Sequence, residues 1–300
     1  MNTAFKYMSY LGVEYFENPT FRISLVEELN DPFEGSLSDD IDRIVDEMMK
    51  SMISEDDIDA DKEEELKKVV ERNIKGTLNG AGVISFSETH RNLLMWAHYA
   101  DNHEGICIEV ETDWSKSKPR LYDTLSNALH SFQRVKYDTR RADYSDIVEI
   151  NVQNQNKITI DLCMKHLTLK SDEWMYEKEH RNIMSFLEAD YVKLKPGKTI
   201  PKELRNRINK SKIKYLDNGY TTTECSDLEF FDNVFESNLF MYLSKVPANK
   251  IKRIYLGARF NEKDKIINAF KNPNHPLHHV EIFKCEINNS RFEIDAIRVY

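Results

Sequence analysis

The segment GVISFSETHRNLLMWAHYADNHEGICIEVE, from Gly82 to Glu111, decides the fold. Its first part, Val83 to Ser87, is mostly apolar and predicts a strand. Asn92 to Asp101 predicts a short helix that ends near Gly105. Residues 106–111 then alternate between aliphatic and other side chains, which predicts a half-buried strand. Strand, polar corner, helix and strand thus follow one another within thirty residues.

The rest of the chain mixes strands and helices without regular alternation. Short strands are predicted near the N-terminus, in AFKYMSY and TFRISL, and HRNIMSF reads as another. The chain closes with predicted strand IKRIYLG, helix EKDKIINAF and strands VEIFKCEIN and RFEIDAIRVY. Helices are predicted at about 158–169 and 228–244. This order favours an α+β fold with a central mixed or antiparallel sheet and flanking helices over a doubly wound α/β fold.

Charge divides the chain into unequal parts. The net charge is −9, but Glu27 to Glu65 alone hold 17 acidic and 3 basic residues. Tyr191 to Tyr215 hold nine Lys or Arg residues against one acid. We predict a single domain over residues 1–300, with an acidic helical insertion at about 38–78 and a basic helical segment at about 191–216. The basic segment would suit a nucleic acid or another polyanion, although a solvated helix face gives the same pattern.

The composition points to a cytoplasmic protein. The sequence contains no run of roughly 18 apolar residues, so we expect no membrane contact. The N-terminus lacks the features of a signal peptide. The four cysteines are far apart and form no CxxC pair, which argues against both a disulfide framework and a zinc knuckle.

Two polar and aromatic clusters are candidates for a site. The corner of the Gly82–Glu111 segment carries Ser87, Trp96, His98 and Tyr99. The second cluster, WMYEKE, places Glu177 and Glu179 after Trp174 and Tyr176 and ahead of a predicted strand. A fixed carboxylate beside aromatic rings suits chemistry at the glycosidic bond of a nucleotide, because the transition state there carries positive charge. Core packing and an exposed strand entry remain the alternatives for these residues.

Four blocks together resemble one bacterial family. They are FRISLVEELNDPFEG (21–35), ISFSE (84–88), LMWAHYADNHEGICIEVE (94–111) and WMYEKEHRNI (174–183). The chain resembles the domain-of-unknown-function family numbered 2971. The resemblance implies a soluble bacterial protein, often from the accessory genome, where antiviral defence and toxin systems also occur. It implies no established reaction.

The arrangement around Glu179 also looks like the ADP-ribosyltransferase superfamily, which has a split sheet and a glutamate on a late strand. That resemblance implies NAD as the nucleotide and a role as a bacterial toxin or antiphage defence effector. No unambiguous triad of that superfamily can be read, and Lys6 competes with Arg22 for the earlier-strand position. The catalytic candidates are Glu179, Glu177, His98 and Arg22, and the NAD-binding candidates are Trp96, Tyr99, Ser87, Tyr176 and Asn30.

Two other classes of function stay open. A non-catalytic module could bind a ligand, a nucleic acid or a protein partner of a defence complex. A metal-dependent nuclease could use oxygen and nitrogen ligands from Asp31, Glu34, Glu88, His98 and His103. Their spacing is not a known ligand pattern, so we expect no metal. NDPFE is more simply a braced turn.

Overall fold

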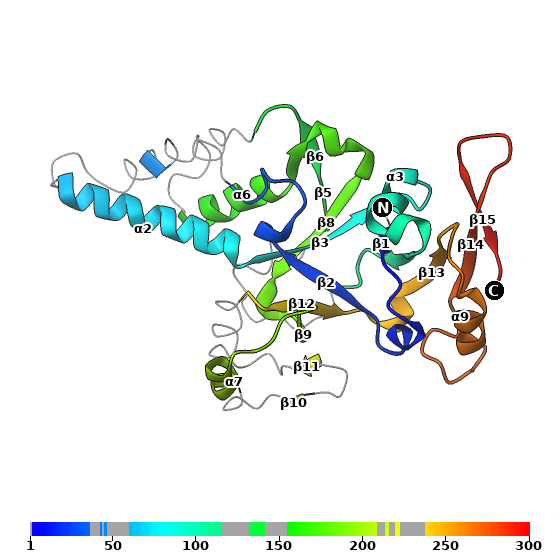
Figure 1. Ribbon diagram of the computed structural model, residues 1–300. Helices are drawn as coiled ribbons and strands as arrows, with labels where there is room; N and C mark the ends of the chain where they lie inside the picture. Colours follow the sequence, from blue (N-terminus) through cyan, green and yellow to red (C-terminus); the bar gives the residue numbers. More distant parts are fainter. Residues whose placement is uncertain are drawn as a thin grey trace.

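The computed structural model describes residues 2–36, 43, 45–46, 60–115, 132–141, 155–208, 214–215, 220–222 and 238–300. The fold is α+β, as predicted, with one large mixed sheet and flanking helices (Figure 1). Eleven strands follow the order β10-β11-β9-β12-β2-β3-β1-β4-β13-β14-β15, and β8 and β5 branch from β3. The outermost strands of that path are β10 (Lys214–Tyr215), β11 (Tyr220–Thr222), β14 (Glu281–Ile287) and β15 (Ile294–Arg298).

The sheet forks at β3 (Ala81–Ser87). One edge of β3 pairs along its whole length with β8 (Glu179–Ser185), which in turn pairs with β5 (Phe132–Arg134). The other edge is shared by two strands, β2 (Thr20–Leu25) at its start and β1 (Thr3–Met8) at its end. From there the two strands continue into different partners. β1 pairs with β4 (Ile106–Glu111), and β2 pairs with β12 (Phe240–Lys245). Among the described strands, none pairs with the middle of this β3 edge.

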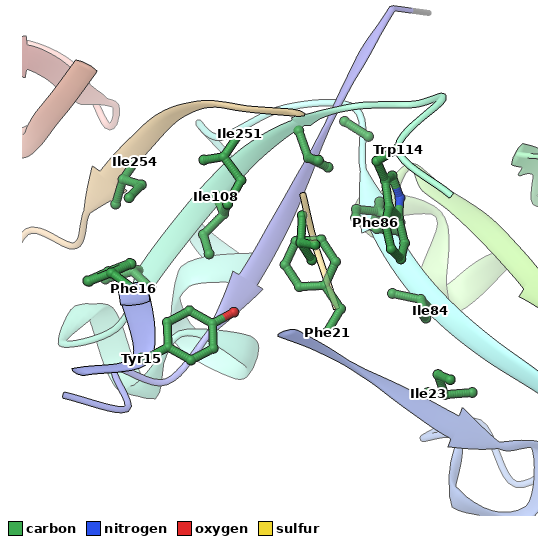
Figure 2. Close-up of a cluster of buried hydrophobic side chains, with 14 of the residues drawn as sticks. Tyr15, Phe16, Phe21, Ile23, Ile84, Phe86, Ile108, Trp114, Ile251 and Ile254 are labelled. Atoms are coloured by element: carbon green, nitrogen blue, oxygen red, sulfur yellow. The ribbon is translucent and has the colours of Figure 1, made fainter. Parts of the chain in front are cut away.

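The largest apolar core covers one face of this sheet (Figure 2). Phe21, Phe86 and Trp114 meet edge to face or tilted, with ring centroids 5.5–6.4 Å apart. Such ring pairs add about 0.5–1.5 kcal/mol beyond the burial of their area. The same core continues under β13 (Ile251–Leu256) to α9 (Lys263–Phe270).

The opposite face is apolar at one end and polar at the other. Along paired β3 and β8, Val83 faces Ile183, Ser85 faces Arg181, and Ser87 faces Glu179. The apolar end is covered by α2 (Ala60–Asn79), which lies in the predicted insertion, and by α6 (Gln155–Leu167). Beyond them, α3 (Leu93–Tyr99) packs Trp96 against Tyr7 of β1. The polar end therefore lies between the helices, at the fork.

The structure corrects one predicted helix. Residues 228–244 were expected to be helical, but Phe240–Ser244 belong to strand β12 between β9 (Tyr191–Leu194) and β2. The earlier part of that expected helix, up to residue 237, lies outside the described residues. An unbroken apolar run has no period that separates a buried helix from a buried strand, and here pairing with two neighbours decides it. The closing unit β13-α9-β14-β15 is confirmed.

Substitution by alanine should change the free energy of unfolding in opposite directions at two glycines. A Cβ on Gly257 would lie 2.1 Å from the carbonyl oxygen of His103, whose loop packs against the end of β13. We expect Gly257→Ala to destabilise the fold by about 1–3 kcal/mol, because that backbone must move. Gly76, inside α2, has nothing within 4 Å of its added Cβ, so Gly76→Ala should stabilise by about 0.5–1 kcal/mol. Urea unfolding of both variants checks this, and equal shifts would contradict the close approach at Gly257.

Candidate functional site

A cavity of about 200 Å³ opens at the fork, in the gap between β1 and β2. The sequence elements that meet there are both forked strands, β3, the 28–34 turn, α3 and the start of β8. Its lining includes Lys6, Tyr7, Arg22, Ser24, Asn30, Glu34, Ser85, Tyr99, Lys170, Glu177, Glu179 and Arg181. We call this cavity the fork pocket. Each of the four motif blocks contributes a residue to it.

A continuous polar network joins those blocks. The Asn30 amide donates to the Tyr99 hydroxyl (2.8 Å), and Tyr99 donates to Oε1 of Glu177. Lys170, on β7 (Leu169–Ser171), bridges Glu177 Oε2 (2.7 Å) and Glu179 Oε2 (3.3 Å). Asn30 is exposed and Glu177 is 3% exposed, so the network runs from the surface to the interior.

Arg181 holds the buried end of the network. It is 1% exposed, and its Nε and Nη2 donate to the two oxygens of Glu179 at 2.8 and 3.0 Å. Nη2 also reaches Glu34, and Nη1 donates to the Leu167 carbonyl (2.7 Å). Burial alone would raise the pKa of Glu179, but Arg181 and Lys170 outweigh it and lower that pKa to about 2. Glu179 is therefore ionised at neutral pH.

The two candidate carboxylates differ in their free acceptor capacity. A carboxylate accepts about four hydrogen bonds. Glu179 receives two from Arg181, one from Lys170 and one from the Ser85 hydroxyl. Glu177 receives one from Tyr99 and one from Lys170. Glu177 is thus the acid with room for a ligand hydroxyl, and Glu179 fixes its surroundings.

Two cations stand on the strand side of the pocket. Lys6 Nζ donates to the Ser85 carbonyl (2.9 Å), in the part of β3 that the fork leaves unpaired, and forms no ion pair within the described ranges. Burial lowers the pKa of Lys6 to about 8, although Glu179 partly opposes this. Arg22 is paired with Glu28 (3.0 Å), and its side chain stays 45% exposed. Both are placed to meet an anionic ligand.

Four of the predicted site residues do not present a free group to this pocket. Trp96 is fully buried and donates Nε1 to the His90 carbonyl (2.7 Å), so it is a core residue and not a stacking platform. Ser87 lines the pocket, but it is fully buried and its hydroxyl donates to the Glu177 carbonyl (2.7 Å). Tyr176 and His98 lie outside, with ring centroids 6.1 Å apart and His98 exposed. Arg22, Asn30, Tyr99, Glu177 and Glu179 do converge.

The residues considered for a nuclease metal site do not all meet at one place within the described ranges. Glu88 lies near Arg134 and His180, and His103 lies against the Trp96 ring and Arg259. Within the described part of the chain, no group of three or more His, Cys, Asp or Glu side chains is arranged to hold a metal ion.

The basic segment is only partly described. Its ends are the strands β9 and β10, so the prediction of a helical segment over the whole of 191–216 is wrong there. The helix predicted from Pro201 is confirmed as α7 (Lys202–Ile208). Lys195 is engaged internally with Glu28 (2.7 Å). Binding of a nucleic acid by this segment stays a prediction. Among the described residues, no helix has both the length and the apolar character needed to cross a lipid bilayer.

Comparison with known families gives a match to part of the chain. Residues 95–182 match the family described as "Protein of unknown function (DUF2971)". This stretch, less than half of the chain, is similar to that family. This confirms the resemblance seen in the motif blocks, and the matched stretch holds Tyr99, Lys170, Glu177, Glu179 and Arg181. Lys6, Arg22, Asn30 and Glu34 complete the pocket from outside that stretch. No curated protein and no solved structure matches the chain.

Sequence reasoning missed the cations that organise the acids. Arg181 is two residues after Glu179 on a strand, so period-two alternation places both on one face and could have paired them. Lys170 carries no such signal, because only the fold brings β7 beside the start of β8. Lys6 was named only as a competitor of Arg22, and both line the pocket.

Proposed function

We propose that the fork pocket binds a nucleotide, with NAD as the first candidate, and that the protein is an ADP-ribosyltransferase-like enzyme. The observation that carries the proposal is the fork itself. A split between two strands opens a cavity in which two cations face a carboxylate that has free acceptor sites. The cations suit a diphosphate and the carboxylate suits a ribose hydroxyl.

The size of the pocket fits one end of the dinucleotide. Ligand pockets commonly span roughly 300–1,000 Å³, and this cavity measures about 200 Å³. It would take the nicotinamide riboside, while the diphosphate and adenosine extend over Lys6 and Arg22 at its edge. The aromatic residues of its lining are Phe5, Tyr7, Phe86 and Tyr99.

The proposed chemistry is cleavage of the bond between ribose C1′ and the pyridinium nitrogen. The bonding electron pair leaves with nicotinamide, and C1′ gains positive charge as the bond breaks. Glu177 stabilises that charge and accepts a hydrogen bond from a ribose hydroxyl, while Tyr99 and Lys170 hold its carboxylate in place. Water or an acceptor nucleophile then attacks C1′ and loses its proton to solvent. In the cell this activity would make the protein a toxin or an antiphage defence effector.

Release of nicotinamide from NAD tests the enzyme. The wild-type protein is expected to release nicotinamide, and Glu177→Gln should slow release at least 100-fold while still binding NAD. The unfolding transition of the variant shows whether it remains folded. Unchanged turnover in folded Glu177→Gln would contradict the role of this acid, and no turnover by the wild type with candidate acceptors present would contradict the enzyme.

One observation favours a second candidate, a binding module. Three acids of the fork pocket, Glu34, Glu177 and Glu179, are each paired with Arg181 or Lys170, as in a structural network. A module would bind NAD without consuming it, and Glu177→Gln would leave the affinity within a few-fold. Calorimetric binding measured beside nicotinamide release separates the two candidates.

A further inference from the structure

A second cavity, of about 220 Å³, lies next to the fork pocket and has two buried acids in its wall. Asp31, Phe33 and Glu34 of the NDPFE turn form one side. His166 of α6, β7 and the turn at 138–141 form the other. Glu34 and Lys170 line both cavities, so they form the partition between them. We call this second cavity the NDPFE pocket.

Both acids carry an oxygen without a partner. Asp31 is 2% exposed, and its Oδ1 accepts the Phe33 amide (3.0 Å), whereas its Oδ2 has no hydrogen-bond partner among the described residues. Glu34 is 4% exposed. Its Oε1 meets Arg181, whereas its Oε2 has no partner within the described ranges. A buried carboxylate oxygen left unbonded is costly, so two of them, on acids that line one cavity, indicate a missing donor.

The neighbouring groups restrict what that donor can be. His166 Nε2 is already within 2.8 Å of the Glu34 carbonyl, and Arg141 donates to the Phe33 and Ser36 carbonyls. Lys170 is committed to Glu177 and Glu179. None of these groups donates to the orphan oxygens, and neither does Arg140, which also lines the cavity. The cavity also has apolar walls, from Phe33 and Leu169.

We propose that the NDPFE pocket binds a small organic cation, with a guanidinium or ammonium group donating to Asp31 Oδ2 and Glu34 Oε2. A guanidinium offers a planar fork of N–H donors that matches carboxylate oxygens. A bare metal ion suits the pocket less well, since the described residues hold no group of three ligating side chains. This site does not depend on NAD binding in the fork pocket.

Titration with butylguanidine and its neutral isostere N-butylurea tests the site on the full chain. We expect calorimetric binding of butylguanidine at least tenfold tighter than that of N-butylurea, with n-butylamine as the ammonium probe. Asp31→Asn should weaken butylguanidine binding at least tenfold. This variant keeps Oδ1 for the Phe33 amide and replaces only the orphan oxygen, so its melting temperature should not fall.

Asp138→Asn is the matched control. Asp138 lines the same pocket but is exposed, and its Oδ1 already accepts the Arg140 amide (2.9 Å). The Asp138→Asn variant should bind butylguanidine with an affinity within twofold of that of the wild type. Equal affinity for N-butylurea, no butylguanidine binding at millimolar concentration, or unchanged affinity in folded Asp31→Asn would each overturn the proposal. A lower melting temperature of Asp31→Asn without a loss of affinity would make Asp31 a brace of the turn.

Discussion

Replacing Arg181 by methionine is expected to lower the free energy of unfolding by about 3–5 kcal/mol, the cost of breaking a buried ion pair on one side. Arg181 is 1% exposed and is the shared partner of Glu179 and Glu34. Methionine fills similar space but leaves Glu179 with Lys170 alone and Glu34 without its cation. Lysine should not rescue the variant, because one ammonium cannot reproduce the fork that spans two carboxylates.

At acid pH, the free energies of unfolding of Arg181→Met and of the wild type should differ less than at pH 7. The pKa of Glu179 is lowered from 4.5 to about 2 in the folded protein. Its contribution to stability is complete above pH 4.5 and is lost as the pH falls through 2, because the unfolded chain then binds the proton more readily. Without Arg181, the pKa of Glu179 rises toward its ordinary value. Acidification therefore lowers the free energy of unfolding of the variant less than that of the wild type.

Urea unfolding at pH 7 and pH 3 measures both effects. Arg22→Met is the matched control, since Arg22 is half exposed in its side chain and pairs with Glu28 at the surface. It should change stability by no more than about 1 kcal/mol. A loss below 1 kcal/mol for Arg181→Met, equal to that of the control, would show that the buried network does not stabilise the fold.

Replacing Lys6 by methionine is expected to weaken NAD binding roughly 10- to 100-fold, the worth of a charge-assisted hydrogen bond. The same variant should not be less stable at pH 7. The pKa of Lys6 is lowered from 10.5 to about 8, so burial of its charge opposes folding at neutral pH. Because the unfolded chain binds this proton more tightly, wild-type stability should rise with pH between 8 and 10.5, and Lys6→Met should lose that rise.

The pH dependence of binding gives a second readout. A phosphate needs the charged ammonium, so wild-type affinity should fall as the pH rises through about 8. Lys6→Met should show no such fall. Calorimetry at pH 7 and pH 9 with both proteins checks this. If Lys6→Met bound NAD as tightly as the wild type, or if its melting temperature were much lower, Lys6 would be a structural residue and not a ligand contact.

Local sequence patterns predicted the elements whose apolar and polar residues follow a clear strand or helix pattern. The strands predicted at 83–87 and 106–111, the helix between them and the closing unit all follow from their local sequence patterns, and the structure has them. Residues 240–244 were misassigned because their strand is defined by β9 and β2, which are distant in sequence. The fork at β3 has no sequence signature, since it depends on how two strands share one edge.

The sequence predicted the acids of the candidate site but not the cations that hold them in place. Glu177 and Glu179 stood out by their spacing ahead of a strand, and Tyr99 by its place on a short helix. Trp96 was misjudged because a core face and a ligand face of a short helix carry the same aromatic pattern. The preference for Glu177 over Glu179 came only from counting hydrogen bonds in three dimensions.

Crystals of the wild-type protein grown with NAD test the central claim most directly. The account predicts density for NAD or ADP-ribose in the gap between β1 and β2. A ribose hydroxyl should lie within hydrogen-bond distance of Glu177, and the phosphates should lie against Lys6 and Arg22. An empty fork pocket at saturating NAD, or NAD bound on another face of the molecule, would contradict it.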